Sequence, residues 1–266
     1  MYKDKFIAFV DILGFTDLVR QSEEAKEGAP TLEYLLDLTR KLGSSKDSDI
    51  YAKFGPTICP DASYLSKDLD FRITQISDCV VVSAEVSPAG AINLLHHCFG
   101  ISIELLMVGR LCRGFVTRGN IFHTDKQFVG SGYMNAYKAE AKVSVFQVNS
   151  ADVGTPFIEI DPAVCTYLQS ENDQCVKTMF KRMTETDANS NTCISPFSVL
   201  KRMPTAFVGT FNQKEWNNEV KSMKTRWLSV MEQLRKVEVD GSDRVRMIIG
   251  YYIRKIIAIL ETLPRY

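Results

Sequence analysis

The pattern of apolar and polar residues along the chain predicts a mixture of short strands and longer helices. Runs of mostly apolar, β-forming residues, bounded by glycine, proline or polar turn residues, predict six strands. They cover residues 5–10, 71–76, 79–84, 113–122, 128–129 and 156–160. Only Ser77 and Asp78 separate the second run from the third, so we expect a tight hairpin with Asp78 near its tip.

Apolar residues at helical spacing fall between these strands and after them. The predicted helices begin near Thr16 and then cover residues 32–42, 88–108, 132–143, 162–168, 214–236 and 242–263. Ser87 and Pro88 are typical of the cap and first turn of a helix. Residues 44–67 and 184–196 are expected to be irregular. The order β-α-α-β-β-α-β-β-α-β-α indicates an α+β fold of ferredoxin-like type, followed by a C-terminal helical extension.

Composition narrows the class of protein but names no activity. The chain has 266 residues, is 45% hydrophobic and 24% charged, and carries no net charge, which is ordinary for a soluble globular protein and gives no argument for nucleic-acid binding. No apolar run reaches the length of a membrane span and no signal peptide is evident, so we expect a cytoplasmic protein without membrane contact. Seven cysteines without a C-x-x-C pair favour free thiols over a zinc site or a disulfide framework.

The zero net charge conceals a division of the chain. Residues 1–176 hold 16 basic and 23 acidic side chains, a net charge of −7. Residues 177–266 hold 16 basic and 9 acidic side chains, a net charge of +7. Such asymmetry suggests two organisational parts, so we expect a domain over 1–176 and a basic, mainly helical extension over 177–266.

Two aspartates stand in unusual positions. Asp11 interrupts an otherwise apolar strand, and burying a carboxylate costs several kcal/mol unless it is paired or bound to a cation. Asp78 lies between two strands that we expect to belong to the same sheet as the strand of Asp11. Two carboxylates that meet at one strand end favour Mg²⁺ or Mn²⁺. The alternatives are that Asp11 is a strand-end or helix-cap residue and that Asp78 is an ordinary turn residue.

Four segments resemble, in order, the motifs of class III nucleotide cyclases. Residues 9–16 (FVDILGFT) resemble the opening F-x-D-I-x-G-F-T of that family, and residues 76–78 (ISD) stand where it usually has I-G-D. Residues 113–119 (RGFVTRG) resemble its R-G-x-I-x-x-G strand, and residues 130–140 resemble the strand-to-helix segment that closes the site. The resemblance covers about residues 5–170. It implies a class III cyclase core, in which helices flank a mainly antiparallel sheet.

The resemblance also implies a two-metal catalytic site. Asp11 and Asp78 would bind two divalent ions, Mn²⁺ or Mg²⁺, with the carbonyl of Ile12 as a further ligand. Phosphates would lie on backbone amides at a helix start, at Gly14, Phe15 and Thr16. The ribose 3′-hydroxyl would attack the α-phosphate and release pyrophosphate. Since the family's site forms between two antiparallel subunits, the resemblance implies a homodimer with shared active sites.

The chain departs from the family's pattern at the base-reading positions. Gln75 stands where purine cyclases often carry a lysine, and Gln127 stands at their other base-reading position. An amide both donates and accepts hydrogen bonds, so these side chains could read a different base edge. The alternative is that both glutamines are ordinary polar strand residues.

The positions that contact the transition state and the phosphates differ as well. The family's asparagine aligns with Met134, beside Asn135, and its arginine aligns with Lys138, a cation that lacks a bidentate fork. Its phosphate-binding arginine aligns with Asn120, and Arg118 lies two residues away. We therefore expect Asn135 and Lys138 to act in catalysis and Arg118 to bind phosphate.

A compact cyclase core with an altered base pocket resembles the pyrimidine cyclases of bacterial anti-phage systems. The resemblance implies that UTP is converted to 3′,5′-cyclic UMP, which activates a separate effector without needing stable contact with it. The alternatives are a cytidylate, adenylate or guanylate cyclase, and a non-catalytic module that binds nucleotide.

Overall fold

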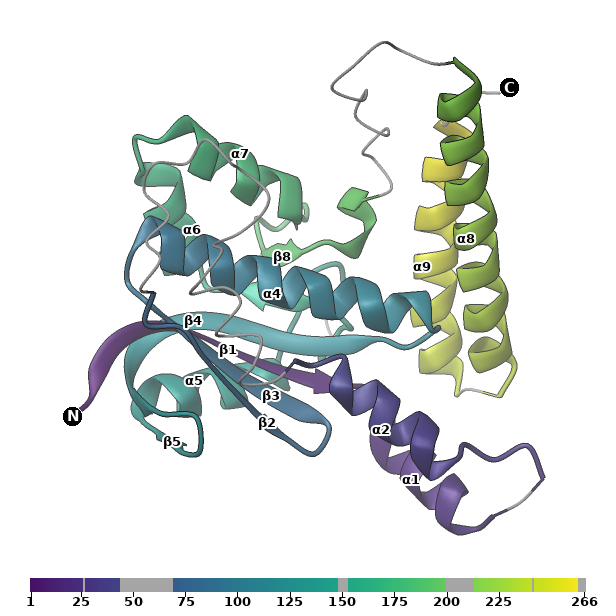
Figure 1. Cartoon of the computed structure of the whole chain (residues 1–266), viewed down its shortest axis with the longest axis horizontal. Coiled ribbons are helices and arrows are strands. Elements are labelled where there is room, and N and C mark those ends of the chain that lie inside the picture. Colours follow the sequence, from purple (N-terminus) through teal and green to yellow (C-terminus); the bar gives the residue numbers. More distant parts are fainter. Residues whose placement is uncertain (26, 44–68, 148–152, 200–212, 241, 263–266) are drawn as a thin grey trace. The chain divides into compact units, whose positions relative to one another are not determined.

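The computed structural model describes residues 1–25, 27–43, 69–147, 153–199, 213–240 and 242–262 (Figure 1). The segment 44–67, expected to be irregular, therefore lies outside the described residues. The chain forms two compact units. Unit 1 comprises Met1–Leu105 and Leu111–Ser195, and unit 2 comprises Leu106–Arg110 and Pro196–Tyr266. The charge boundary after residue 176 thus falls inside unit 1, whose fold continues to Ser195.

Unit 1 is built on a mainly antiparallel sheet with the strand order β2-β3-β1-β4-β6-β8-β7, and β5 pairs with β4. The strands are β1 (Lys3–Ile12), β2 (Arg72–Ile76), β3 (Cys79–Glu85), β4 (Cys112–His123), β5 (Phe128–Val129), β6 (Ile158–Ile160), β7 (Thr184–Thr186) and β8 (Thr192–Ile194). Every pair is antiparallel except β4 with β6. The structure therefore confirms the predicted α+β class with a central, mainly antiparallel sheet.

Helices cover both faces of this sheet. The described helices that precede Pro196 are α1 (Phe15–Glu23), α2 (Leu32–Arg40), α4 (Pro88–Met107), α5 (Ser131–Glu140), α6 (Pro162–Ser170) and α7 (Gln174–Met183). α4 lies over one face and α5 over the other (Figure 1). This arrangement explains why β1 is apolar on both of its faces, since a strand between two helical layers meets no water.

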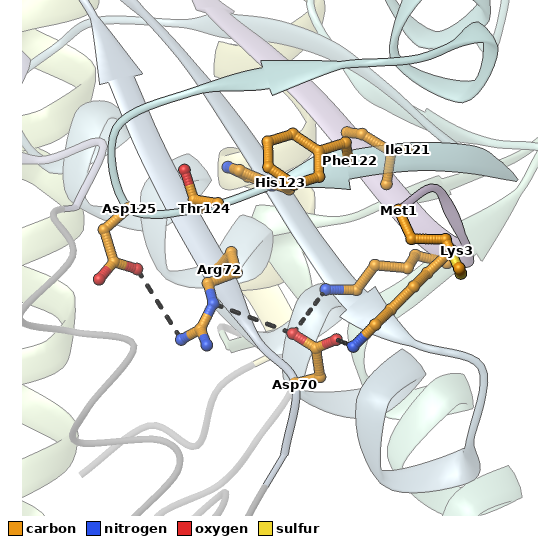
Figure 2. Close-up of a pocket in the computed structure, with 10 residues that line it drawn as sticks. Met1, Lys3, Asp70, Arg72, Ile121, Phe122, His123, Thr124 and Asp125 are labelled. Atoms are coloured by element: carbon orange, nitrogen blue, oxygen red, sulfur yellow. Dashed lines mark hydrogen bonds and ion pairs between the residues drawn. The ribbon is translucent and has the colours of Figure 1, made fainter.

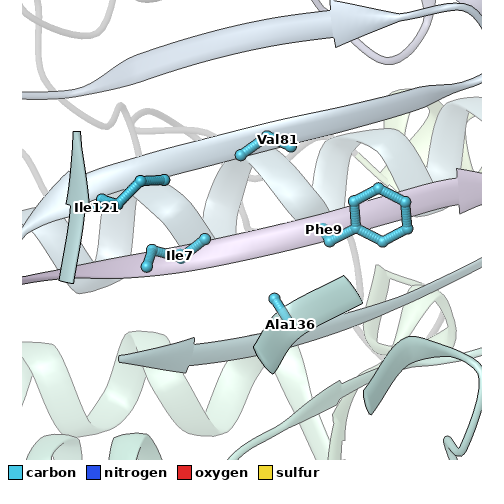
Figure 3. Packing of buried hydrophobic residues seen from close by; sticks show 5 residues of the cluster. All are labelled: Ile7, Phe9, Val81, Ile121 and Ala136. Atoms are coloured by element: carbon cyan, nitrogen blue, oxygen red, sulfur yellow. The ribbon is translucent and has the colours of Figure 1, made fainter. Parts of the chain in front are cut away.

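The core beneath α5 fixes how that helix lies against the sheet. One apolar cluster joins the side chains of three strands to the middle of α5. It consists of Ile7, Phe9, Val81, Ile121 and Ala136 (Figure 3). Phe9 also makes edge contacts with the rings of Tyr133 and Tyr137, at centroid distances of 6.3 and 5.3 Å. The position of α5 relative to β1 is therefore set by interdigitating side chains rather than by a connecting loop.

The long helix α4 begins as its sequence predicts. The hydroxyl of Ser87 accepts a hydrogen bond from the backbone N–H of Gly90 at 3.0 Å, and Pro88 occupies the first turn. Among the described helices, α4 alone is long and apolar enough to cross a membrane, but 72% of its most apolar window is buried in this structure. Burial of that kind is typical of a core helix.

The prediction was wrong for the segment 184–196. It forms the strands β7 and β8 and the start of the 3-10 helix η1 (Pro196–Val199), and helix α7 precedes it unpredicted. Both strands have only three residues, which is too short for a period of two to be recognised. A second correction concerns the cysteines, because Cys175 is disulfide-bonded. Five other cysteines are free thiols.

Unit 2 contains two long helices, α8 (Gln213–Asp240) and α9 (Asp243–Thr262), which pack side by side (Figure 1). Trp227, Val230 and Leu234 are buried along α8. Their spacing at positions three to four apart is that of the buried stripe of a packed helix. The predicted C-terminal helical extension is therefore present in the structure.

Candidate active site

The structure brings Asp11 and Asp78 together at one end of the sheet. Asp11 is the penultimate residue of β1 and lies opposite Cys79 of β3. The next residue, Ile12, donates its backbone N–H to the carbonyl oxygen of Asp78 at 3.0 Å. The hairpin tip is thus fastened to the end of β1, and the predicted convergence of the two aspartates is confirmed.

The turn that presents Asp78 is tight and carries backbone strain. Ile76 and Cys79 form the last pair of the β2–β3 ladder, so only Ser77 and Asp78 remain in the loop. Ser77 adopts a φ of 53°, in the left-handed region that favours glycine. Glycine is also the residue that class III cyclases usually have at this position. A serine occupies this position of the turn, although a side chain makes a positive φ costly.

The two carboxylates lie in a locally acidic and partly buried environment. Burial and the charges of Asp78 and Glu140 together raise the pKa of Asp11 to about 7, against the opposing effect of the charge of Arg113. Burial and the same carboxylates raise the pKa of the Cys79 thiol to about 11. The negative charge at this strand end thus exceeds the positive charge nearby. A divalent cation is the kind of ligand that would balance it.

One ion pair beside Asp11 was not anticipated. Arg113 lies opposite Asp11 in the β1–β4 ladder, and its Nε donates to Oε1 of the buried Glu140 at the end of α5. A second guanidinium nitrogen donates to the carbonyl oxygen of Gly154 at 3.3 Å. This pairing joins residues 27 apart in sequence, so no local pattern could have indicated it. It ties the end of α5 to the strand next to Asp11.

The donor set suits a hard cation. It consists of the carboxylates of Asp11 and Asp78 with the adjacent main chain at Ile12, and oxygen ligands of this type suit Mg²⁺ and Mn²⁺. Glu140 is held by Arg113 and is therefore less able to serve as a third ligand. Over the described ranges, no group of three or more His, Cys, Asp or Glu side chains is placed to hold a metal. The site thus offers two protein carboxylates and leaves further positions for substrate oxygens or water.

The segment after Ile12 forms the start of a helix. Gly14 has a φ of 74° and stands at the N-terminal boundary of α1, so the chain turns sharply from β1 into the helix. Phe15 is buried and anchors the first turn, while Gly14 and Thr16 are exposed. Backbone amides at such a start point away from the helix and bind anions such as phosphate. The predicted phosphate-binding residues are therefore at a helix start immediately after Asp11.

The two glutamine-bearing segments lie close to one another. Thr74 of β2 interacts through its hydroxyl with Nε2 of His123 at 3.0 Å and donates to the carbonyl oxygen of Thr124 at 3.3 Å. Thr124 in turn donates its backbone N–H to the carbonyl oxygen of Gln127 at 2.8 Å. Gln75 follows Thr74 directly and donates its side-chain amide to the carbonyl oxygen of Ser77 at 3.0 Å. Neighbouring elements thus carry Gln75 and Gln127.

The remaining predicted residues do not reach the Asp11 end within this chain. Arg118 lies opposite Phe6, whereas Arg113 lies opposite Asp11. Five strand residues correspond to about 17 Å. The guanidinium of Arg118 donates to Asp4 at 2.6 and 2.9 Å. The prediction that Arg118 binds phosphate therefore has no support from its position relative to Asp11 in one chain.

The catalytic candidates on α5 are turned away from the sheet. Gly132, Ala136 and Glu140 are buried and repeat every four residues, which defines the face of α5 that meets the strands. Asn135 and Lys138 are exposed on other faces of the helix. Within a single chain, the carboxylates of Asp11 and Asp78 and the side chains of Asn135 and Lys138 therefore lie on surfaces that face different directions.

Comparison with solved structures finds similarity to an adenylyl cyclase and to an adenylyl cyclase-like protein. Two structures of a bacterial light-regulated adenylyl cyclase match at TM-scores of 0.41 and 0.40 and 15% identity, over 64% of this chain and 47% of that chain. A class III adenylyl cyclase-like ATP-binding protein from Pseudomonas aeruginosa matches at a TM-score of 0.39 and 13% identity, over 75% of this chain and 40% of that chain. The chain thus spans less than half the length of these structures. No family model and no curated protein matches the sequence.

Proposed function

We propose that the protein is a metal-dependent nucleotide cyclase of the class III type. The observation that carries this proposal is the convergence of Asp11 and Asp78 beside a sharp turn into α1. These residues belong to segments whose sequences resemble the first two motifs of that family. A carboxylate pair next to a helix start is suited to hold a triphosphate together with its metal ions.

The residues have distinct roles in the proposed reaction. The carboxylates of Asp11 and Asp78 and the carbonyl of Ile12 would hold the ions. Bound divalent ions neutralise phosphate charge and favour deprotonation of the ribose 3′-hydroxyl. Backbone amides at Gly14, Phe15 and Thr16 orient the phosphates so that the hydroxyl oxygen lies in line with the α-phosphorus. The new O3′–P bond replaces the bond to pyrophosphate, which leaves.

A homodimer completes the proposed site. Asn135 and Lys138 are exposed on α5, on faces other than the one that meets the sheet. Large apolar side chains are also exposed on α5, β5 and the edge strand β2, namely Met134, Tyr137, Val129 and Ile76. Exposed apolar residues around functional positions are typical of a protein–protein contact. We propose that a second copy covers this surface and receives Lys138 at its own Asp11 site.

UTP is the proposed substrate and 3′,5′-cyclic UMP the proposed product. Gln75 and Gln127, on neighbouring elements, replace the base-reading residues of purine cyclases, and amides can pair with a pyrimidine edge. The proposed biological role is synthesis of a second messenger in anti-phage defence in the cytoplasm. A separate effector would respond to the cyclic nucleotide without stable contact with the enzyme.

The product of a four-nucleotide assay tests the proposal. Purified full-length protein is incubated separately with ATP, GTP, CTP and UTP in the presence of Mn²⁺, and products are identified by mass. We expect cyclic UMP and pyrophosphate from UTP. Asp11→Asn and Asp78→Asn should each reduce turnover by at least about a thousandfold while leaving the circular dichroism spectrum unchanged.

The other outcomes separate the alternatives. Cyclic AMP or cyclic GMP as the sole product would refute the pyrimidine assignment and retain the cyclase assignment. Cyclic CMP would retain the pyrimidine class and refute the uridine preference. Metal-dependent nucleotide binding by calorimetry, without any cyclic product, would indicate a non-catalytic module and would refute the enzymatic proposal.

A further inference from the structure

A cavity lies at the opposite end of β1 from the two aspartates. Its volume is about 310 Å³, within the range of small-molecule sites. Its lining residues come from the start of β1, the start of β2 and the end of β4: Met1, Lys3, Lys5, Asp70, Arg72, Ile121, Phe122, His123, Thr124 and Asp125 (Figure 2). Lys5 precedes Asp11 by six strand residues, about 20 Å. The cavity is thus remote from Asp11 in the same chain.

Three cations in this cavity share one carboxylate. Lys3 and Lys5 lie 2.8 and 2.9 Å from the two carboxylate oxygens of Asp70. Arg72 approaches the same carboxylate at 3.9 Å (Figure 2). Among the described residues that line the cavity, the second carboxylate is that of Asp125, which is largely exposed. Cations therefore outnumber carboxylates, and the charge balance of the cavity leaves room for one more anion.

The burial of Lys5 makes this imbalance costly. Its side chain is only 3% exposed, and Asp70, its acceptor, also interacts with Lys3 and Arg72. A buried ammonium is stabilised only by well-placed negative charge, and here one carboxylate is divided among three cations. An anion that enters the cavity would lower the electrostatic cost of keeping Lys5 charged.

Arg72 has the geometry to bind such an anion. Its distances to Asp70 and Asp125, 3.9 and 3.8 Å, are longer than hydrogen bonds. Arg72 also donates a hydrogen bond from a terminal nitrogen to the carbonyl oxygen of Phe71, at a long distance of 3.5 Å. A guanidinium has five N–H donors in a planar fork that fits phosphate or carboxylate oxygens. Its weak contacts could be exchanged for a bidentate one at little cost.

The wall of the cavity is fixed and neutral at His123. Its Nδ1 interacts with the hydroxyl of Ser83 at 2.8 Å and its Nε2 with the hydroxyl of Thr74 at 3.0 Å. Burial, together with the charges of Lys5 and Arg72, lowers the pKa of His123 to about 4. The imidazole therefore adds no cation near pH 7, and selectivity for an anion rests on the two lysines and Arg72.

We propose that this cavity binds a small oxyanion, a molecule that carries a phosphate or a carboxylate group, at a site remote from Asp11 and Asp78. Lys3 and Arg72 contact the anion, and Phe122 provides an apolar wall. The buried Lys5 adds a positive charge that attracts the anion. The proposal does not depend on cyclase activity, because none of these residues has a role in the proposed reaction.

Equilibrium dialysis of the full-length protein with radiolabelled phosphate, and separately with radiolabelled succinate, tests the site at low salt. The Asp11→Asn variant is used without added divalent metal, so that metal-dependent binding of the anion beside Asp11 does not contribute. We expect saturable binding of at least one anion with one site per chain. Binding of phosphate alone identifies a phosphate-type ligand, and binding of succinate alone identifies a carboxylate-type ligand.

Three substitutions in the same background locate the binding. Arg72→Gln should weaken it by about tenfold through loss of a charge-assisted contact. Asp125→Asn should strengthen it by about threefold because it removes a repelling charge, an effect that misfolding could not imitate. Arg40→Gln, which breaks the exposed pair of Arg40 with Asp37 on α2, is the matched control and should change nothing. Absence of saturable binding for both anions, or equal affinities in all three variants, would overturn the proposal.

Discussion

Individual residues near Asp11 keep their positions through charge pairs that are partly withdrawn from water. Arg113 and Glu140 form such a pair, with side chains 21% and 7% exposed. The pair links α5 to β4, the strand next to Asp11. The carbonyl oxygen of Gly154 accepts a hydrogen bond from another nitrogen of the same guanidinium. Gly154 has a φ of 76°, a conformation that favours glycine, and an added Cβ would lie 2.6 Å from the guanidinium and displace it. Arg113 thus positions the acidic site although it is not expected to contact substrate.

The substitution Glu140→Gln should lower the free energy of unfolding by about 2–3 kcal/mol, because a largely buried arginine loses its ionic partner. Urea denaturation measures this value. The exposed pair of Arg40 and Asp37 provides the control, and Asp37→Asn should cost less than about 1 kcal/mol. Equal losses in the two variants would contradict the importance assigned to the buried pair.

His123 gives the protein a predicted sensitivity to acid. Burial and the charges of Lys5 and Arg72 lower its pKa to about 4, below the value near 6.5 of an unfolded chain. The unfolded state therefore binds the proton first, and the stability due to neutral His123 is lost as pH falls from about 6.5 to about 4. At pH 5 this loss amounts to about 2 kcal/mol.

The variant His123→Gln should lose less stability than the wild type between pH 7.5 and pH 5, because glutamine cannot bind the proton. Urea denaturation at both pH values measures the difference. Parallel losses in the two proteins would mean that His123 is not the titrating group. The comparison uses the pH dependence rather than the absolute stability, which the substitution will also change.

Helices and strands were predictable where their own residues show a clear apolar pattern or clear turn and cap residues. Strand β1, the β2–β3 hairpin and α4 have long apolar runs or clear turn and cap residues, and each lies where the sequence places it. The β7–β8 pair was missed because its three-residue strands form by pairing, β8 with β6 and β7 with β8. The candidate site divides in the same way. Asp11 and Asp78 follow from local pattern, whereas the contact between Arg113 and Glu140 depends on how α5 packs.

The packing of α5 on β4 depends on two glycines. A Cβ added at Gly119 of β4 would lie 2.9 Å from the Cα of Gly132 in the first turn of α5. Gly119→Ala should therefore push α5 away from the sheet and cost about 1–3 kcal/mol. Gly100 of α4 is the control, since nothing lies within 4 Å of a Cβ there. Gly100→Ala should stabilise the protein by up to about 1 kcal/mol.

Thermal unfolding followed by circular dichroism measures both glycine variants. The expected shifts in melting temperature have opposite signs, which separates a steric effect from a general effect of added methyl groups. A melting temperature for Gly119→Ala at or above that of the wild type would mean that α5 accommodates the methyl group without moving. In that case the close approach of α5 would not constrain the position of Glu140.

At the scale of the whole molecule, one chain does not assemble all the predicted catalytic residues. The buried face of α5 carries Glu140 toward Asp11, and other faces of the same helix expose Asn135 and Lys138. A rigid helix cannot present both faces to the same strand end. If Lys138 acts in catalysis, it must act on a substrate held by another copy of the chain. The proposed dimer is therefore testable without a structure of the complex.

Two inactive variants should therefore restore activity to one another. Asp11→Asn removes a metal carboxylate and Lys138→Ala removes the residue proposed to reach across the interface. In an equal mixture that exchanges subunits freely, half of the dimers are mixed and each mixed dimer keeps one intact site, so about one quarter of the wild-type rate should return. A mixture of Asp11→Asn with Asp78→Asn is the control. Both changes damage the metal-binding part of their own chain, so no site is intact and no activity should return. If neither mixture recovers while native mass spectrometry shows that mixed dimers have formed, Lys138 does not act across an interface.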